Sequence, residues 1–147
     1  MNTAILAPAA ALAVWSILML IWMAATRFPA MKAMREAKGS SGMVSKSRAG
    51  GRGQDLEGQI PDKVNWKAHN YTHLMEQPTV FYAVVIIHAL TGAGQTEIAL
   101  AWLYVGLRVV HSLWQNLVNT IPVRLMIFVA GSITLMILSI RALLATI

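Results

Sequence analysis

Four long apolar segments restrict this chain to a membrane fold. Helices are expected over residues of about 4–28, 66–91, 97–118 and 122–146. Each is close to the roughly 20 residues that a helix needs to cross the hydrocarbon core. Because backbone polar groups find no water there, spanning segments of this kind fold as helices. The sequence therefore predicts an all-α integral membrane four-helix bundle, a single domain over residues 1–147.

The composition agrees with this class and excludes some chemistry. Only 12% of the residues are charged and 56% are hydrophobic, whereas a soluble domain carries roughly 25% charged residues. Cysteine is absent, which excludes disulfides, thiolate metal sites and cysteine nucleophiles. The four histidines are scattered along the chain, and their spacing predicts no metal site.

Basic residues gather between the first two apolar segments. Nine of the twelve Lys and Arg residues fall between Arg27 and Lys67. Beside apolar segments, such an excess marks the cytoplasmic side of a membrane, and it requires no nucleic acid as a partner. We therefore expect a cytoplasmic first loop over about 38–65 and both termini outside. The glycines and serines of this loop predict a mobile segment.

Four ionisable side chains lie within or at the edge of the apolar segments: Glu76, Arg108, His111 and Arg124. Such residues usually face a partner or a wet cavity, because a charge in a bilayer is costly. At 1.5 Å per residue, Glu76 and Arg108 each lie about 15 Å from the same membrane surface. An internal ion pair that only fixes helix packing is one interpretation. A functional site is the other.

Further polar residues are expected in the same half of the membrane. Asn70 and His73 are expected on the same helix face as Glu76, six and three residues before it, and Gln115 follows His111 by one turn. Together these side chains predict a polar funnel that opens toward the cytoplasm, with Glu76 and Arg108 at its base.

Local signals add two expectations about the backbone. Pro78 removes one helical hydrogen bond and predicts a kink beside Glu76. Asn119 or Thr120 is expected to cap the last helix. Tyr104 lies one turn from Arg108, and packing is the better interpretation of its role.

Three stretches resemble a known family. Glu76-Gln77-Pro78, with Phe81-Tyr82 after it, resembles the second helix of bacterial MAPEG proteins, the membrane-associated proteins in eicosanoid and glutathione metabolism. The segment 101–112, AWLYVGLRVVHS, resembles their third helix, and 119–124, NTIPVR, continues the likeness. The resemblance covers residues of about 70–125 well. Because it is to bacterial proteins, it implies a location in a bacterial inner membrane.

The resemblance implies a fold, a co-substrate and an activity. Subunits of this family are four-helix bundles that associate as homotrimers in membrane lipid. Their enzymes bind glutathione between subunits, near the cytoplasmic side, and act as transferases or peroxidases on hydrophobic electrophiles. Carried over to this chain, Glu76 would hold the amino group of glutathione, and Arg124 would stabilise its thiolate, which is the nucleophile. The residues lining the same site would be Arg108, His111, Asn70, His73 and Gln115.

The chain departs from the eukaryotic enzymes of that family at several positions. Gln115 stands where they have a tyrosine. His69, Thr72 and His73 stand where they carry arginines and an asparagine, which leaves Lys67 as a candidate partner for a glutathione carboxylate.

The family also includes members that bind lipid without catalysis. A non-catalytic lipid- or fatty-acid-binding membrane protein is therefore the alternative function. A proton-coupled transporter that uses Glu76 and His111 is disfavoured, because four spans show no broken-helix repeat.

Overall fold

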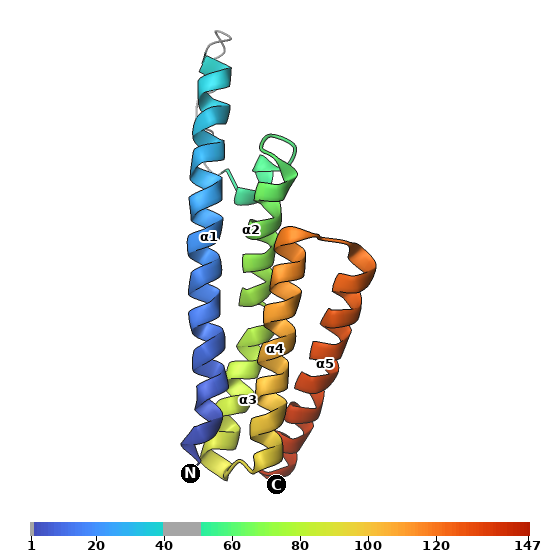
Figure 1. Ribbon diagram of the computed structural model, residues 1–147. Coiled ribbons are helices and arrows are strands. Elements are labelled where there is room, and N and C mark those ends of the chain that lie inside the picture. The colour runs from blue at the N-terminus through green and yellow to red at the C-terminus, as the bar shows by residue number, and fades with distance from the viewer. Residues whose placement is uncertain (1, 40–50) are drawn as a thin grey trace.

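The computed structural model describes residues 2–39 and 51–147, and the regular elements within those ranges are all helical. Figure 1 shows an elongated bundle with both termini at one end. Two short 3-10 helices, η1 (Thr3–Ile5) and η2 (Gly53–Leu56), precede α1 and α2 respectively. The longer helices are α1 (Leu6–Gly39), α2 (Asp62–Met75), α3 (Gln77–Thr91), α4 (Gln95–Leu117) and α5 (Ile121–Leu144).

Three helical segments are long and apolar enough to cross a membrane: Thr3–Ala37, Asp62–Thr91 and Ile121–Leu144. They confirm three of the four expected spans and make this an integral membrane protein. The middle segment combines α2 and α3. α4 is less apolar because one of its faces is polar, but that face is buried in the bundle while Leu103, Val110 and Leu117 are exposed. Its outer surface is thus as apolar as that of its neighbours.

α1 continues well past its expected end near residue 28. It runs to Gly39 and includes Pro29. The residues after Pro29 are mostly Ala, Met, Lys, Arg and Glu, which favour helices. The expected end was too early because it followed the end of the apolar run, whereas the backbone follows helix propensity.

The second expected helix is interrupted beside Glu76. α2 ends at Met75 and α3 begins at Gln77, and Glu76 has φ −89° and ψ −96°. Pro78 lies in the first turn of α3, where its missing N–H costs nothing to the new helix. The kink predicted from Pro78 is confirmed, and it opens the backbone at the residue that was expected to bind a ligand. α2 also begins four residues earlier than expected, with Asp62 in its first turn.

The core surrounds α4, which packs against α5, α1 and α2. Tyr104 stacks on Phe81 with ring centroids 4.5 Å apart, and both side chains are fully buried. Leu12 of α1 and Leu138 of α5 are buried with them. This apolar half of the interior holds the helices together and leaves the other half for polar groups.

The two ends of the bundle differ in chemistry. At the far end, Asn2 donates hydrogen bonds to the carbonyls of Ala89 and Ala93, and Arg141 of α5 pairs with Glu97 of α4. The other end holds the C-terminal half of α1, residues 51–61 and the α4–α5 loop (Figure 1). Because most of the Lys and Arg residues lie there, we call it the basic end.

Residues 51–61 of the expected loop pack against the helices, and the mobility of the loop stays a prediction. Arg27 of α1 donates a hydrogen bond to the carbonyl of Gly53. Glu57 lies 2.8 Å from Nε2 of His69 on α2. These contacts join distant segments, which loop composition cannot reveal. Residues 40–50 of the expected loop lie outside the described residues.

The α4–α5 loop turns within a few residues. Thr120 is the N-cap residue of α5, but it makes no side-chain capping bond. Its hydroxyl instead accepts a hydrogen bond from Nε1 of Trp114 at 3.0 Å. The position of the cap was therefore predicted correctly, and the capping interaction was not.

Candidate functional site

Glu76 lies at the surface of the bundle, at the break between α2 and α3. Its side chain is 60% exposed, and Oε2 lies 3.1 Å from Nδ1 of His73. At Glu76 the backbone leaves the helical conformation, so its side chain does not lie along a continuous helix. The carboxylate therefore faces outward, available to a ligand.

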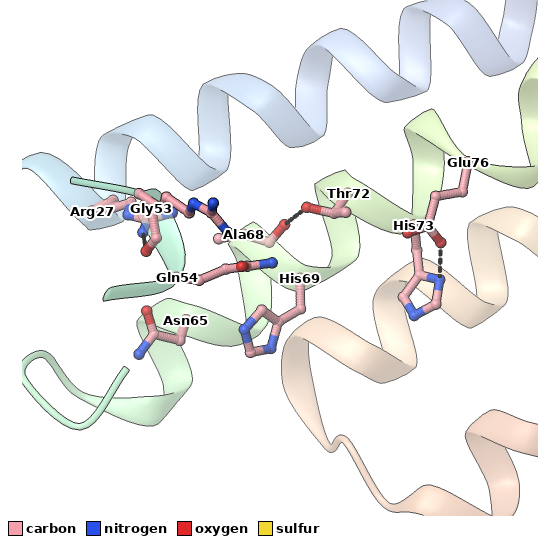
Figure 2. A pocket seen from close by; sticks show the side chains of 10 residues that line it. Arg27, Gly53, Gln54, Asn65, Ala68, His69, Thr72, His73 and Glu76 are labelled. Atoms are coloured by element: carbon pink, nitrogen blue, oxygen red, sulfur yellow. Dashed lines mark hydrogen bonds and ion pairs between the residues drawn. The ribbon is translucent and has the colours of Figure 1, made fainter. Parts of the chain in front are cut away.

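A pocket of about 460 Å³ extends from Glu76 toward the basic end. Figure 2 shows its lining side chains along α2, with Arg27 and Gly53 at one end and His73 and Glu76 at the other. The lining residues are Arg27, Arg52, Gly53, Gln54, Asn65, Ala68, His69, Thr72, His73 and Glu76. Most of its lining residues are polar, with cationic groups at one end and a carboxylate at the other.

The spacing along α2 explains why these side chains share one wall. His69, Thr72, His73 and Glu76 follow each other at intervals of three, one and three residues, which places them on one face of a helix. α1 contributes Arg27, at the point where its uncharged run ends. The segment 51–54 closes the remaining side.

Arg108 is buried in the bundle and does not pair with Glu76. Its Nε donates to the hydroxyl of Tyr104 at 2.9 Å, and the guanidinium carbon lies 5.5 Å from the ring centre of Phe128. Within the described residues no carboxylate lies within 4.0 Å of Arg108. The equal depth predicted for Glu76 and Arg108 did not produce an ion pair, because depth along the axis says nothing about which face each side chain occupies.

A hydrogen-bonded chain continues from Arg108 to α3 and α5. The hydroxyl of Tyr104 donates to Oε1 of Gln77 at 3.4 Å, and Nε2 of Gln77 donates to Oγ of Ser132 at 2.8 Å. The packing interpretation of Tyr104 was thus incomplete. Tyr104 is also the only hydrogen-bond partner of Arg108 in the part of the chain that the structure describes.

Three helices meet in a ring cluster beside the pocket. The ring centroids of His73 and His111 are 5.9 Å apart, and Phe128 lies 6.3 Å from His73 and 6.2 Å from His111. Arg108 borders the same cluster through Phe128. The structure therefore brings together His73, Glu76, Arg108 and His111, as the sequence predicted.

Asn70 lies elsewhere. Its Nδ2 donates to Oγ of Ser112 at 2.7 Å, and only 1% of the residue is exposed. It was expected on the same face as Glu76, which was wrong. Six residues correspond to about 600° of helix rotation, so Asn70 and Glu76 point roughly 120° apart.

Gln115 is also enclosed in the bundle. It is 1% exposed, and its Oε1 has no partner within the described residues. Oδ1 of Asn70 and Oδ1 of Asn116 also have no hydrogen-bond partner within the described residues. These three amides are buried inside the chain and do not line the pocket that Glu76 lines.

Arg124 lies beside the ring cluster but does not line the pocket. It is in the first turn of α5, one turn before Phe128. Its Nη1 donates to Oδ1 of Asn119 at 2.7 Å. Asn119 has φ +56°, a left-handed conformation that asparagine tolerates. The α4–α5 turn thus holds the guanidinium in place.

The family model for MAPEG proteins matches residues 5–144 of this chain. The chain belongs to the MAPEG family. No curated protein and no solved structure matches it. The match covers nearly the whole chain, so it includes α1 and both ends of the bundle as well as the resembling segments.

Several lining residues of this MAPEG protein were missed by sequence reasoning: Arg27, Arg52, Gln54, Asn65, His69 and Thr72. Two signals could have found some of them. The helical spacing from His69 to Glu76 marks one face, and Arg27 is the first charge after a long uncharged run. Nothing in the sequence indicates that residues 52–54 fold back against α1. Lys67, a candidate carboxylate partner, instead lies over the ring of Trp22 at 5.4 Å.

Proposed function

We propose that this MAPEG protein is a glutathione-dependent transferase or peroxidase that acts on hydrophobic electrophiles. The observation that carries the proposal is the polar pocket at the basic end, with Glu76 at one end and Arg27 and Arg52 at the other. The family includes glutathione transferases and peroxidases as well as other members.

The pocket suits a peptide with one amino group and two carboxylates. Its volume of about 460 Å³ is within the range of small-molecule sites. From Asn65 to Glu76, α2 rises by about 16 Å, whereas three extended residues span about 11 Å. An extended tripeptide therefore fits lengthwise.

The charges give the ligand a direction. The amino group of glutathione would donate to the exposed carboxylate of Glu76, a charge-assisted hydrogen bond. The glycine carboxylate would lie toward Arg27 and Arg52. Arginine suits that role because its planar fork can bind a carboxylate through two parallel bonds.

The chemical step needs a thiolate and a cation near it. In the transferase reaction, the sulfur forms a bond to an electrophilic carbon, the bond to the leaving group breaks, and the thiol proton passes to solvent. A positive side chain favours the thiolate, and we assign that role to Arg124. The assembly in which this happens is a homotrimer in this proposal, with the site on the cytoplasmic side and the neighbouring subunit covering the pocket.

Turnover tests this assignment. Purified protein in detergent would be assayed with glutathione and a chromogenic aryl halide or a lipid hydroperoxide. We predict that Arg124→Ala lowers kcat/KM by about two orders of magnitude, the loss expected for removal of one electrostatic donor. Arg141→Ala, at the far end of the bundle, is the matched control. Turnover that is unchanged in Arg124→Ala would remove the assigned role.

One observation favours a second function. Arg124 is bonded to Asn119 and does not line the pocket, which agrees with a non-catalytic member that binds lipid or fatty acid. If this second function is correct, the wild type shows no turnover with either electrophile. Native mass spectrometry then finds a lipid retained by the purified protein. Loss of all lipid on purification would count against it.

A further inference from the structure

The C-terminal half of α1 carries a second, separate hollow. It has a volume of about 280 Å³ and is lined by Phe28, Met31, Lys32 and Arg35. These residues repeat at intervals of three, one and three, so they form one face of α1. None of them lines the larger pocket. We propose that this face is a binding site for the headgroup of an anionic phospholipid.

The depth of the hollow along α1 supports a lipid as its occupant. The uncharged run of α1 from residue 4 to residue 25 is about 33 Å long, close to the roughly 30 Å of the hydrocarbon core. Phe28 follows about 4 Å beyond that run and Lys32 about 10 Å beyond it. The face therefore begins in the headgroup layer of whichever leaflet meets the basic end.

The direction of the side chains brings their charges closer to the membrane. Long side chains on a helix lean toward its N-terminus, which for α1 is the direction of the membrane. Lys32 and Arg35 can thus present their charges about one turn nearer the headgroups than their backbone positions. Phe28 and Met31 lie nearer the membrane than these charges, and the Phe28 side chain is 69% exposed. Both can serve as apolar contacts for the start of an acyl chain.

The charges of this face are largely free to bind an anion. Arg35 has no carboxylate within 4.0 Å in the described residues. Lys32 lies 3.9 Å from Glu36, but the two side chains are 80% and 68% exposed. Such a surface pair contributes little, and a phosphate can replace it. The two cations lie at headgroup depth, where they can bind the phosphate of an anionic phospholipid. The two apolar side chains beside them can contact the start of its acyl chains.

Native mass spectrometry of the full chain in detergent, titrated with phosphatidylglycerol or phosphatidylcholine, tests the site. We predict that the wild type retains phosphatidylglycerol in preference to phosphatidylcholine. The double variant K32Q/R35Q should bind it about 25-fold more weakly, from about fivefold for each basic residue near a membrane surface. Glu36→Gln should bind it more tightly, because a competing carboxylate is gone. Turnover with glutathione should be unchanged in both variants, since none of the substituted residues lines the larger pocket.

Lys63→Gln is the matched control, because it removes one exposed cation at the same end of the bundle without touching this face. Its affinity for phosphatidylglycerol should stay within twofold of the wild type. An equal loss in Lys63→Gln and K32Q/R35Q would show attraction to bulk charge and overturn the site. Absence of a preference over phosphatidylcholine, or displacement by equimolar glycerol phosphate, would also overturn it.

Discussion

The buried guanidinium of Arg108 shows how a single residue is stabilised inside this bundle. Arg108 is 2% exposed, its Nε donates to Tyr104, and its Nη2 has no partner among the described residues. A buried charge needs hydrogen bonds and polarisable neighbours. The rings of Tyr104 and Phe128, at 5.3 and 5.5 Å from the guanidinium carbon, supply part of that environment.

Tyr104→Phe should therefore destabilise the protein. The change keeps the stacked ring but removes the acceptor for Arg108, which costs about 1–3 kcal/mol for a buried partner left unpaired. This corresponds to a fall of several degrees in the apparent Tm, measured by thermal unfolding in detergent. Tyr71→Phe is the control, because the Tyr71 hydroxyl makes no hydrogen bond within the described residues. Equal Tm values for the two variants would contradict the account of Arg108.

At this scale the sequence predicted which side chains lie near one another better than it predicted their hydrogen-bond partners, and their roles stay predictions. Residue type and apolar context were enough to single out Glu76, Arg108 and His111. The contact of Arg108 with Tyr104 could not be separated from packing, because a tyrosine one turn away can point either into a core or at a charge. Asn70 was misplaced because its distance along the chain was considered without its rotation around the helix.

At the scale of the helices, local backbone conformation determines where glycine is needed. α3 ends at Thr91, and the C-cap residue Gly92 has φ +101° and ψ +91°. A residue with a Cβ is strained in that region. By contrast, Gly106 lies in the middle of α4, and an added Cβ would meet nothing within 4 Å. The two glycines have opposite roles in the stability of their elements.

Alanine substitution at these glycines should shift stability in opposite directions. Gly92→Ala should lose about 1–2 kcal/mol of stability, the penalty of a left-handed conformation with a side chain. Gly106→Ala should gain up to about 1 kcal/mol, because alanine is the better helix former. Thermal unfolding of both variants beside the wild type measures the shifts. A Gly92→Ala protein as stable as the wild type would show that the turn does not depend on glycine.

Sequence patterns predicted the existence of the helices more accurately than their ends. The apolar runs located the spans, and Pro78 located the break at Glu76. The extension of α1 to Gly39 follows from helix propensity in a stretch that is no longer apolar. The folding of residues 51–61 against α1 and α2 depends on contacts such as Arg27 with Gly53, which are 26 residues apart and have no local signature.

In the whole molecule, the half toward the far end has an apolar interior, and the half near the basic end holds the polar groups. Both termini lie at the far end in Figure 1. The larger pocket exists only because α1, residues 52–54 and α2 meet at the basic end. The candidate site is thus a property of the assembled bundle, although its strongest residue, Glu76, is visible in the sequence.

Glutathione binding measured by isothermal titration calorimetry in detergent tests the central claim most directly. The wild type should bind at millimolar glutathione or below. Glu76→Gln should bind at least tenfold more weakly, because it loses a hydrogen bond between charged groups. Asp62→Asn, an acidic residue of α2 outside the pocket, should bind as the wild type does. No binding by the wild type, or equal affinity in Glu76→Gln, would contradict the proposed site.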